Sequence, residues 1–295
     1  MMTVALRLNR FKNTAVWKPS TLSARFVSAK TAVGTLTSVT TALAFAASAS
    51  AQSVPTATKD TFSIGTGYSV WHGDFGAPTK TLIWSALVDA RYQTGGLRLT
   101  AVLPRMRIRS DGAFFAGLGG TPLFAAPNIK PARRVREGWG DVTLGAAYLL
   151  PGGGERGFDL ELNGRAKLPT ATKSSQLSTG KADYSGGVEL STTRGNFTPA
   201  VSANYRVFGD TKTWHFQNGF YVTAGGSYAI TPRTAVLLTY EYTQAASRFI
   251  GDAHEVVLGA STPLTQGLRL TAYASKGLSQ GASDLSAGAH LSLAL

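Results

Sequence analysis

Residues 138–190 read GWGDVTLGAAYLLPGGGERGFDLELNGRAKLPTATKSSQLSTGKADYSGGVEL. In the central run, from Phe158 to Leu168, every even position is apolar or small and every odd position is polar or charged. That period of two is typical of a β-strand whose two faces meet different surroundings. The odd face carries two carboxylates, an amide and two cations, which a packed core would not accept unpaired. This strand alone fits either a soluble sandwich or a barrel with lipid outside and water inside.

The same alternation recurs along most of the chain. Twelve segments are each close to the roughly 9 to 11 residues that a tilted strand needs to cross a bilayer. They cover residues 61–71, 81–92, 97–103, 140–150, 158–168, 183–193, 197–208, 219–230, 234–243, 253–262, 267–276 and 284–295. Short connections alternate with mostly longer ones. The pattern predicts an all-β fold, a twelve-stranded antiparallel transmembrane β-barrel of the bacterial outer membrane with short periplasmic turns and longer extracellular loops.

The outward aromatic residues support a barrel over a sandwich. In this topology they gather at the two ends of the segments, as expected where amphipathic rings settle at lipid headgroups. β-Propensity alone explains aromatic residues in strands but not their sorting to the ends. The expected periplasmic band contains Phe62, Tyr92, Tyr148, Phe158, Phe197 and Tyr228, and the expected outer band contains Tyr68, Trp84, Tyr184, Tyr205, Phe220, Tyr240 and Tyr242.

The N-terminus has the features of a secretion signal. Residues 1–51 contain six basic residues and no acidic one, then a mildly apolar run, and end at Ala49-Ser-Ala51. We expect residues 1–51 to be a signal peptide that is removed, 52–60 a periplasmic lead, and 61–295 the barrel, with a long external loop at 104–138. Removing the signal lowers the formal net charge from +13 to +7. The absence of cysteine fits export through an oxidising compartment.

Three short motifs add a resemblance to a known family. They are Gly138-Trp-Gly-Asp141 at the start of a strand, Lys167-Leu-Pro-Thr170, and Ser178-Thr-Gly-Lys-Ala-Asp-Tyr184. In this order they resemble the pattern of an outer-membrane family named for the meta pathway of phenol degradation. The resemblance implies a bacterial outer-membrane barrel that is often labelled a transporter. It implies nothing specific about phenol, because the cargo is generally inferred from neighbouring catabolic genes.

The charged residues that this topology points into the lumen are the candidate selectivity residues. They are expected either to pair across strands and fill a narrow interior, or to set the selectivity of a polar pore; both can hold at once, because twelve strands lie between a filled and an open barrel. The set comprises Asp89, Arg91, Arg98, Asp141, Asp159, Glu161, Arg165, Lys167, Asp183, Glu189, Arg206, Glu241, Glu255 and Arg269.

The expected loop at 104–138 combines basic and apolar residues. Its basic residues, Arg105, Arg107, Arg109, Lys130, Arg133, Arg134 and Arg136, would most simply pair with lipopolysaccharide phosphates. A sharper hypothesis is that the apolar middle folds over or into the barrel mouth and receives a hydrophobic or aromatic solute. The residues of this candidate entry site are Phe114, Phe115, Leu118, Leu123 and Phe124.

Other classes of function are less well supported. His290 and Ser292 share one strand face, as a lipid-modifying barrel enzyme would need, but no nearby carboxylate or amide is evident to orient the imidazole. We therefore expect no enzyme, no cofactor and no metal ion, and the dispersed basic residues do not predict nucleic-acid binding. The sequence favours a channel or transporter for small solutes over a structural or adhesive barrel without an open pore.

Overall fold

The protein is described by a computed structural model, which covers residues 60–126, 134–150, 157–209, 211 and 213–295. The expected signal peptide and residues 52–59 of the expected lead lie outside the described residues. These described residues form fifteen strands and two short 3₁₀ helices, η1 (Leu118–Gly120) and η2 (Lys173–Ser175). The strands are β1 (Thr61–Gly73), β2 (Thr81–Thr94), β3 (Leu97–Arg109), β4 (Ala113–Ala116), β5 (Pro122–Ala126), β6 (Val135–Trp139), β7 (Thr143–Leu150), β8 (Asp159–Lys167), β9 (Asp183–Ser191), β10 (Phe197–Val207), β11 (Gly219–Ala229), β12 (Ala235–Thr243), β13 (Ala253–Pro263), β14 (Leu268–Gly277) and β15 (Leu285–Ala294).

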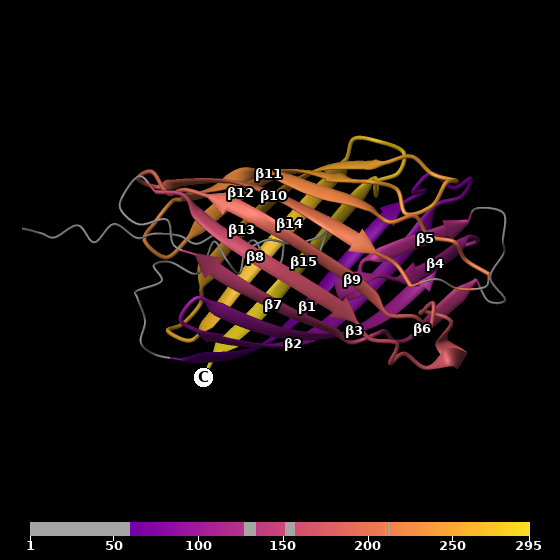
Figure 1. The fold of residues 1–295 in the computed structure, drawn as a ribbon, viewed down its shortest axis with the longest axis horizontal. Coiled ribbons are helices and arrows are strands. Elements are labelled where there is room, and N and C mark those ends of the chain that lie inside the picture. The colour runs from indigo at the N-terminus through magenta and orange to yellow at the C-terminus, as the bar shows by residue number, and fades with distance from the viewer. Residues whose placement is uncertain (1–59, 127–133, 151–156, 210, 212) are drawn as a thin grey trace, which may run out of the picture.

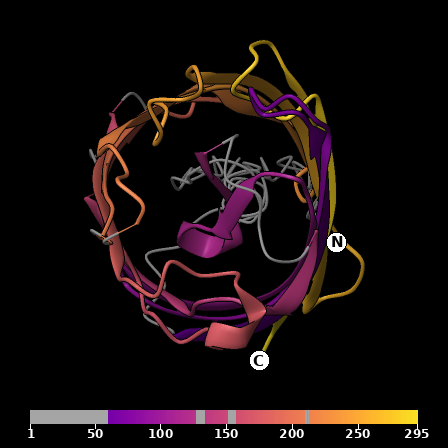
Figure 2. The same ribbon diagram turned by 90° about the vertical axis from the view of Figure 1, so that its right-hand side faces the viewer.

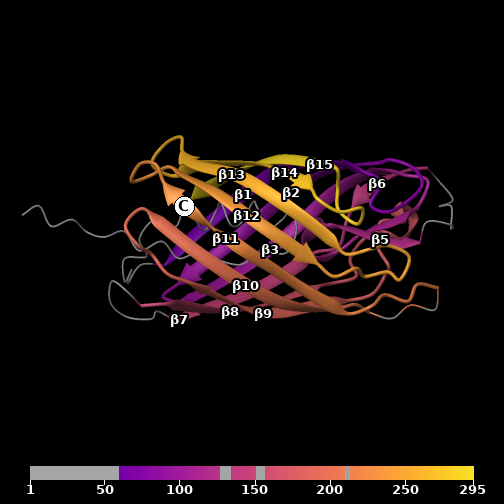
Figure 3. The same cartoon turned by 90° about the horizontal axis from the view of Figure 1, so that it is seen from above.

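The main sheet closes on itself. Its neighbouring strands are antiparallel, and β1 pairs with both β2 and β15 while β2 pairs with β3. Figures 1 and 3 show the strands tilted around a barrel, and Figure 2 shows the closed ring from one end. Because β6 and β7 follow one another along the same edge of β3, the barrel has twelve strand positions, which confirms the predicted fold class.

The break between β6 and β7 is a β-bulge. Arg105 of β3 pairs with Trp139, whereas Val102 pairs with Thr143, so three steps along β3 match four steps along its neighbour. As a result Gly140 and Asp141, adjacent in the chain, are both buried inside the barrel. The bulge therefore turns a carboxylate into the lumen at a height where the alternation of β6 would have pointed it out.

The outer surface of the barrel is an apolar band. Leu162 of β8 pairs with Tyr148 of β7 on one side and with Val188 of β9 on the other, and these three side chains are 44%, 50% and 44% exposed. The alternate residues of β8 turn inward, where Glu161 and Lys167 are buried. An exposed apolar face of this extent suits contact with lipid, as the alternation predicts.

Within the described residues no helix has the length and apolar character to cross a membrane. The excursion expected at 104–138 has different bounds, because Pro104–Arg109 continue β3 and Val135–Trp139 form β6, which pairs with them. Proline is rare inside a strand, so the strand predicted at 97–103 ends before Pro104. Pro104 lies beside the bulge, where its carbonyl accepts a hydrogen bond from the Gly140 N–H at 2.7 Å.

Candidate functional site

The apolar middle of the excursion forms a hairpin inside the barrel. β4 and β5 pair with each other and are joined through η1, and Figure 2 shows this hairpin enclosed by the ring of strands. Four of the five candidate entry residues have buried side chains, and the side chain of the fifth, Phe124, lies outside the described residues. The buried four are Phe114, Phe115, Leu118 and Leu123. We call residues 113–126 the luminal hairpin.

The tip of the luminal hairpin reaches the bulge of the wall. Gly119 and Gly120 have φ angles of 66° and 80°, a left-handed conformation that favours glycine. A Cβ atom on Gly120 would lie 2.9 Å from Cβ of Pro104, so the tip also needs glycine for its close approach to β3. The Gly119 N–H donates to Oγ1 of Thr143 on β7 at 2.9 Å. These contacts fix the depth to which the hairpin enters the lumen.

Arg136 on β6 holds the hairpin from the side. Its guanidinium donates to the carbonyl oxygens of Phe114 at 2.7 Å, Gln176 at 3.2 Å and Gly112 at 3.4 Å, and the side chain is buried. The expectation that Arg136 faces lipopolysaccharide is therefore wrong, because the alternation of β6 turns this residue inward. Lys130 and Arg133 of the same predicted group lie outside the described residues.

The lumen is apolar on the side where β2 and β3 pack against the hairpin. Ile83 of β2 and Met106 and Ile108 of β3 point inward, are at most 1% exposed, and belong to one cluster with Phe114 of the hairpin. The ring of Phe75 packs edge-on against that of Phe114, with centroids 5.3 Å apart. Met106 and Ile108 fall within the loop expected at 104–138, so the sequence pattern does not predict that they point inward.

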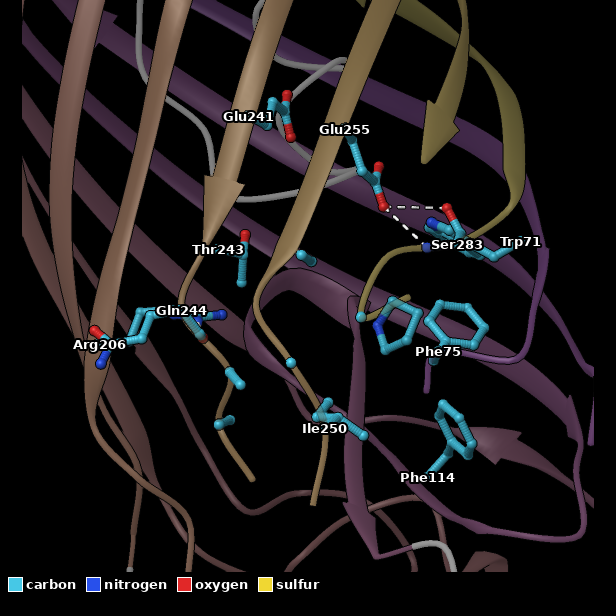
Figure 4. A pocket seen from close by; sticks show the side chains of 16 residues that line it. Trp71, Phe75, Phe114, Arg206, Glu241, Thr243, Gln244, Ile250, Glu255 and Ser283 are labelled. Atoms are coloured by element: carbon cyan, nitrogen blue, oxygen red, sulfur yellow. Dashed lines mark hydrogen bonds between the residues drawn. The ribbon is translucent and has the colours of Figure 1, made fainter. Parts of the chain in front are cut away.

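A cavity of about 90 Å³ lies between the hairpin and the wall formed by β12 and β13. Figure 4 shows Glu241 and Glu255 on that wall, Trp71 beside Ser283, and the rings of Phe75 and Phe114 on the side away from Glu241. Arg206 also lines it. The Arg206 guanidinium donates to the carbonyl of Gln244 at 2.8 Å and lies 5.5 Å from the ring of Phe208. Three of the predicted luminal residues therefore meet at one cavity.

The three motifs behind the family resemblance meet at Lys167. Its Nζ atom is 2.9 Å from Oδ2 of Asp141 and 2.9 Å from Oδ2 of Asp183, and the lysine side chain is fully buried. The Ser178 hydroxyl donates to the Asp141 carboxylate, as does the Ala171 N–H at 2.9 Å. Lys167 at the end of β8 therefore bridges Asp141, which precedes β7, and Asp183 at the start of β9, so both buried carboxylates have an opposite charge.

A second charged group lies deeper in the lumen. Nη2 of Arg98 is 2.6 Å from Oε1 of Glu161, and both Arg91 and Arg165 lie within electrostatic reach of that carboxylate. Glu189 faces Glu161 across the β8–β9 register, is 1% exposed, and neither of its carboxylate oxygens has a hydrogen-bond partner. Cross-strand pairing is thus found for part of the predicted set, and its effect on selectivity stays a prediction.

The opposite end of the lumen holds an aspartate–histidine pair. Asp89 Oδ2 of β2 is 2.6 Å from Nε2 of His290 on β15, so the expectation that no carboxylate orients His290 is wrong. The sequence separation of 201 residues hid this contact. A Cβ atom on Gly65, in the strand between them, would lie 2.5 Å from both side chains, which explains the glycine. Ser292 makes no hydrogen bond to His290 among the described contacts.

The two remaining predicted residues lie near the same end. Arg269 donates to the Arg233 carbonyl at 3.3 Å and lines a cavity of about 250 Å³ together with His290 and Ser292. Asp159 begins β8 opposite Ser191. Within the described residues, no three His, Asp or Glu side chains gather as a metal site would require.

Comparison with known proteins agrees with this architecture. A family model described as "Putative MetA-pathway of phenol degradation" matches residues 47–295. The crystal structure of an outer membrane channel from Pseudomonas putida F1 has a TM-score of 0.59 and 14% identity, over 81% of this chain and 97% of that chain. The KdgM porin in complex with disordered oligogalacturonate gives 0.45 and 9%, over 79% and 97%, and a Pseudomonas aeruginosa FadL homologue gives 0.42 and 9%, over 80% and 90%. No curated protein matches the chain in sequence.

Proposed function

We propose that this chain, which belongs to the family described as "Putative MetA-pathway of phenol degradation", is an outer-membrane channel or transporter. It would admit small solutes, aromatic or hydrophobic ones among them. The luminal hairpin and its apolar surroundings are the observation that carries this proposal. Lumens of water-filled barrels are polar, whereas part of the outer half of this lumen is filled by buried aromatic and aliphatic side chains from β1, β2, β3 and the hairpin.

The physical reason is the different cost of desolvation for the two kinds of solute. A sugar that passes this region would leave its hydrogen bonds with water unreplaced, at roughly 1 to 3 kcal/mol for each buried polar group. An apolar solute gains about 25 cal/mol for each Å² of surface that it buries. The apolar wall would therefore favour apolar solutes over sugars of the same size.

Deletion of Ala113–Ala125 tests the role of the hairpin. In proteoliposomes, the full-length protein should pass a small aromatic solute such as benzyl alcohol faster than a sugar of similar size, and the deletion should raise sugar flux and remove this preference. Heat-modifiable electrophoretic mobility verifies that the shortened barrel still folds. Unchanged flux and unchanged selectivity would remove the hairpin from the mechanism.

The second candidate function is a structural or adhesive barrel without an open pore. The depth of the hairpin favours it, because the tip contacts both β3 and β7. Single-channel recording in planar bilayers separates the two: a channel shows discrete conductance steps and a closed barrel shows none.

We also propose that the chain is not an enzyme. Lipid hydrolysis that is abolished by Ser292→Ala would contradict this.

Lipopolysaccharide is the proposed partner of the outer surface. Arg105 and Arg107 project outward from β3 and lie 5.9 Å and 5.8 Å from the rings of Trp139 and Trp84. Basic side chains beside interfacial tryptophans suit anionic headgroups. Replacing both arginines with glutamine should weaken co-sedimentation with lipopolysaccharide, whereas Arg233→Gln at the other end should not. Equal weakening by both would contradict the assignment.

A further inference from the structure

The glutamates at the outer cavity differ from most other luminal carboxylates. Asp89, Asp141, Asp183 and Glu161 each have a histidine, lysine or arginine nitrogen within 2.9 Å. Among the described residues, Glu241 and Glu255 have no ion-pair partner, although they stand directly opposite each other in the β12–β13 register. Two carboxylates this close in a buried site repel one another unless a cation or a proton lies between them.

The two carboxylates are prepared for a ligand in different ways. Glu255 is positioned by three hydrogen bonds, from the Ser283 N–H at 3.2 Å, the Ser283 hydroxyl at 3.1 Å and the Ser275 hydroxyl at 3.1 Å. Glu241, which lines the cavity, is only 3% exposed, and its Oε1 atom has no hydrogen-bond partner. A buried acceptor without a partner is costly and indicates a missing donor.

The rest of the cavity describes the body of the missing donor. Trp71, Phe75, Phe114 and Ile250 line the same cavity as the two carboxylates, and Figure 4 shows Trp71 beside Ser283 and the rings of Phe75 and Phe114 on the side away from Glu241. Aromatic rings attract organic cations through their faces. A calcium ion, by contrast, would need six to eight oxygen ligands, which two carboxylates beside an aromatic wall do not supply.

We propose that this cavity binds a small organic ammonium ion, with Glu241 and Glu255 holding the charged nitrogen and Trp71, Phe75 and Phe114 enclosing its apolar body. This inference rests on the proposed channel function and narrows its solute class to protonated amines with a hydrophobic group. Arg206 also lines the cavity, but among the described ion pairs it pairs with neither glutamate; its guanidinium donates to the Gln244 carbonyl and lies beside the ring of Phe208, and its Nε atom has no hydrogen-bond partner.

Titration calorimetry on the full-length protein in detergent tests the proposal with benzylamine, which is protonated at pH 7, and its neutral analogue benzyl alcohol. Benzylamine should bind at least about tenfold more tightly than benzyl alcohol, and Glu241→Gln should remove about that tenfold advantage. Glu137→Gln is the matched control, because it makes the same charge change near the same end of the barrel, but on its outer face, and it should leave binding unchanged.

Equal binding of the two probes would overturn the proposal, and so would retained benzylamine affinity in Glu241→Gln. Binding of calcium without binding of benzylamine would also overturn it, in favour of an inorganic cation site. The comparison of the two probes needs only the unaltered protein, so a misfolded variant does not remove the test. Conductance measured on the same preparation reports on the channel separately: binding without conductance refutes the channel function and leaves the ammonium site standing.

Discussion

The Lys167 ammonium shows how single residues stabilise this barrel. It is enclosed between the carboxylates of Asp141 and Asp183, which come from separate sequence motifs. Removing one member of a buried ion group leaves the others uncompensated in a site with little water, which is far more costly than losing an exposed pair. The buried contacts among the three motifs therefore depend on Lys167 more than on an exposed lysine such as Lys181.

Lys167→Met should destabilise the folded barrel by about 3 to 5 kcal/mol, because two buried carboxylates lose their cation. Urea titration followed by heat-modifiable electrophoretic mobility measures the loss. Lys181→Met is the control, since that side chain is exposed, and it should change stability by less than about 0.5 kcal/mol. Similar losses for the two variants would show that the triad contributes no special stability.

At this scale the alternation predicts which side chains face inward but not which of them touch. It placed Asp141, Lys167 and Asp183 in the lumen, and their mutual contacts arise from the bulge at Gly140 and from loop geometry that no period of two encodes. The pairing of Asp89 with His290 depends on closure of the barrel between distant strands. The predicted contact of Arg136 with lipopolysaccharide is wrong because this residue lies in β6 and not in an external loop.

Among the elements, the luminal hairpin depends on one side chain for much of its lateral attachment. Arg136→Gln removes the guanidinium that donates to three carbonyls around the hairpin. The hairpin should then leave the wall more often, so conductance should rise and protease cleavage within 113–126 should become faster. Arg134→Gln is the control, because that guanidinium is exposed and pairs only with Asp111 among the described ion pairs. Unchanged conductance in Arg136→Gln would show that the tip contacts suffice.

The loop between β12 and β13 should respond to pH through Asp252. The Ala245 N–H donates to its carboxylate at 2.8 Å and the Tyr242 hydroxyl at 2.7 Å, and these two bonds hold the pKa of Asp252 below its ordinary value. Because the pKa is lower in the folded loop, the stabilisation is present above the ordinary pKa and is lost as the pH falls through the lowered one.

The measurement for this loop is the amide proton shift of Ala245 by NMR. It should move upfield as the pH falls below about 4, where the carboxylate takes up a proton and accepts the hydrogen bond less strongly. Asp252→Asn should abolish this titration. A shift that persists in the variant would assign the effect to another group.

Strand positions were predicted to within a few residues wherever one face is apolar and the other polar, as in β8, β9 and β10. The prediction failed for β3 beyond Pro104, because a proline and the following arginines read as a loop. It also failed to find β6, whose five residues are too few to establish a period. The hairpin strands β4 and β5 are apolar on both faces, and such runs carry no alternation.

For the whole molecule, the surrounding bilayer is the dominant constraint. Leu162→Arg should destabilise the barrel by roughly 2 to 4 kcal/mol, because that side chain lies on the lipid-facing surface. Asn163→Arg should cost much less, since the neighbouring residue turns toward the lumen. Reversible folding into lipid vesicles, followed in denaturant, gives both values. A larger cost at Asn163 than at Leu162 would reverse the assignment of the two faces.

Closure, strand number and the lipid-facing surface could be predicted because lipid imposes one rule on every strand. The contents of the lumen could not. Inward positions tolerate both polar and apolar residues when an inserted segment covers them, as Ile83 and Met106 illustrate against Glu161 and Lys167. The hairpin residues Phe114 and Pro122 line the outer cavity, so the alternation of the wall strands does not predict it.

The pairing of β3 with β6 has a consequence for how the luminal hairpin can move. The segment leaves the wall at Arg109 and rejoins it at Val135, and these two residues face each other in the register. A displaced hairpin therefore stays tethered to the wall beside its binding position in the lumen, and its effective concentration there is on the order of millimolar. Its return is a first-order event that dilution cannot slow, so a lasting vacant passage requires an occupant that competes for the same space.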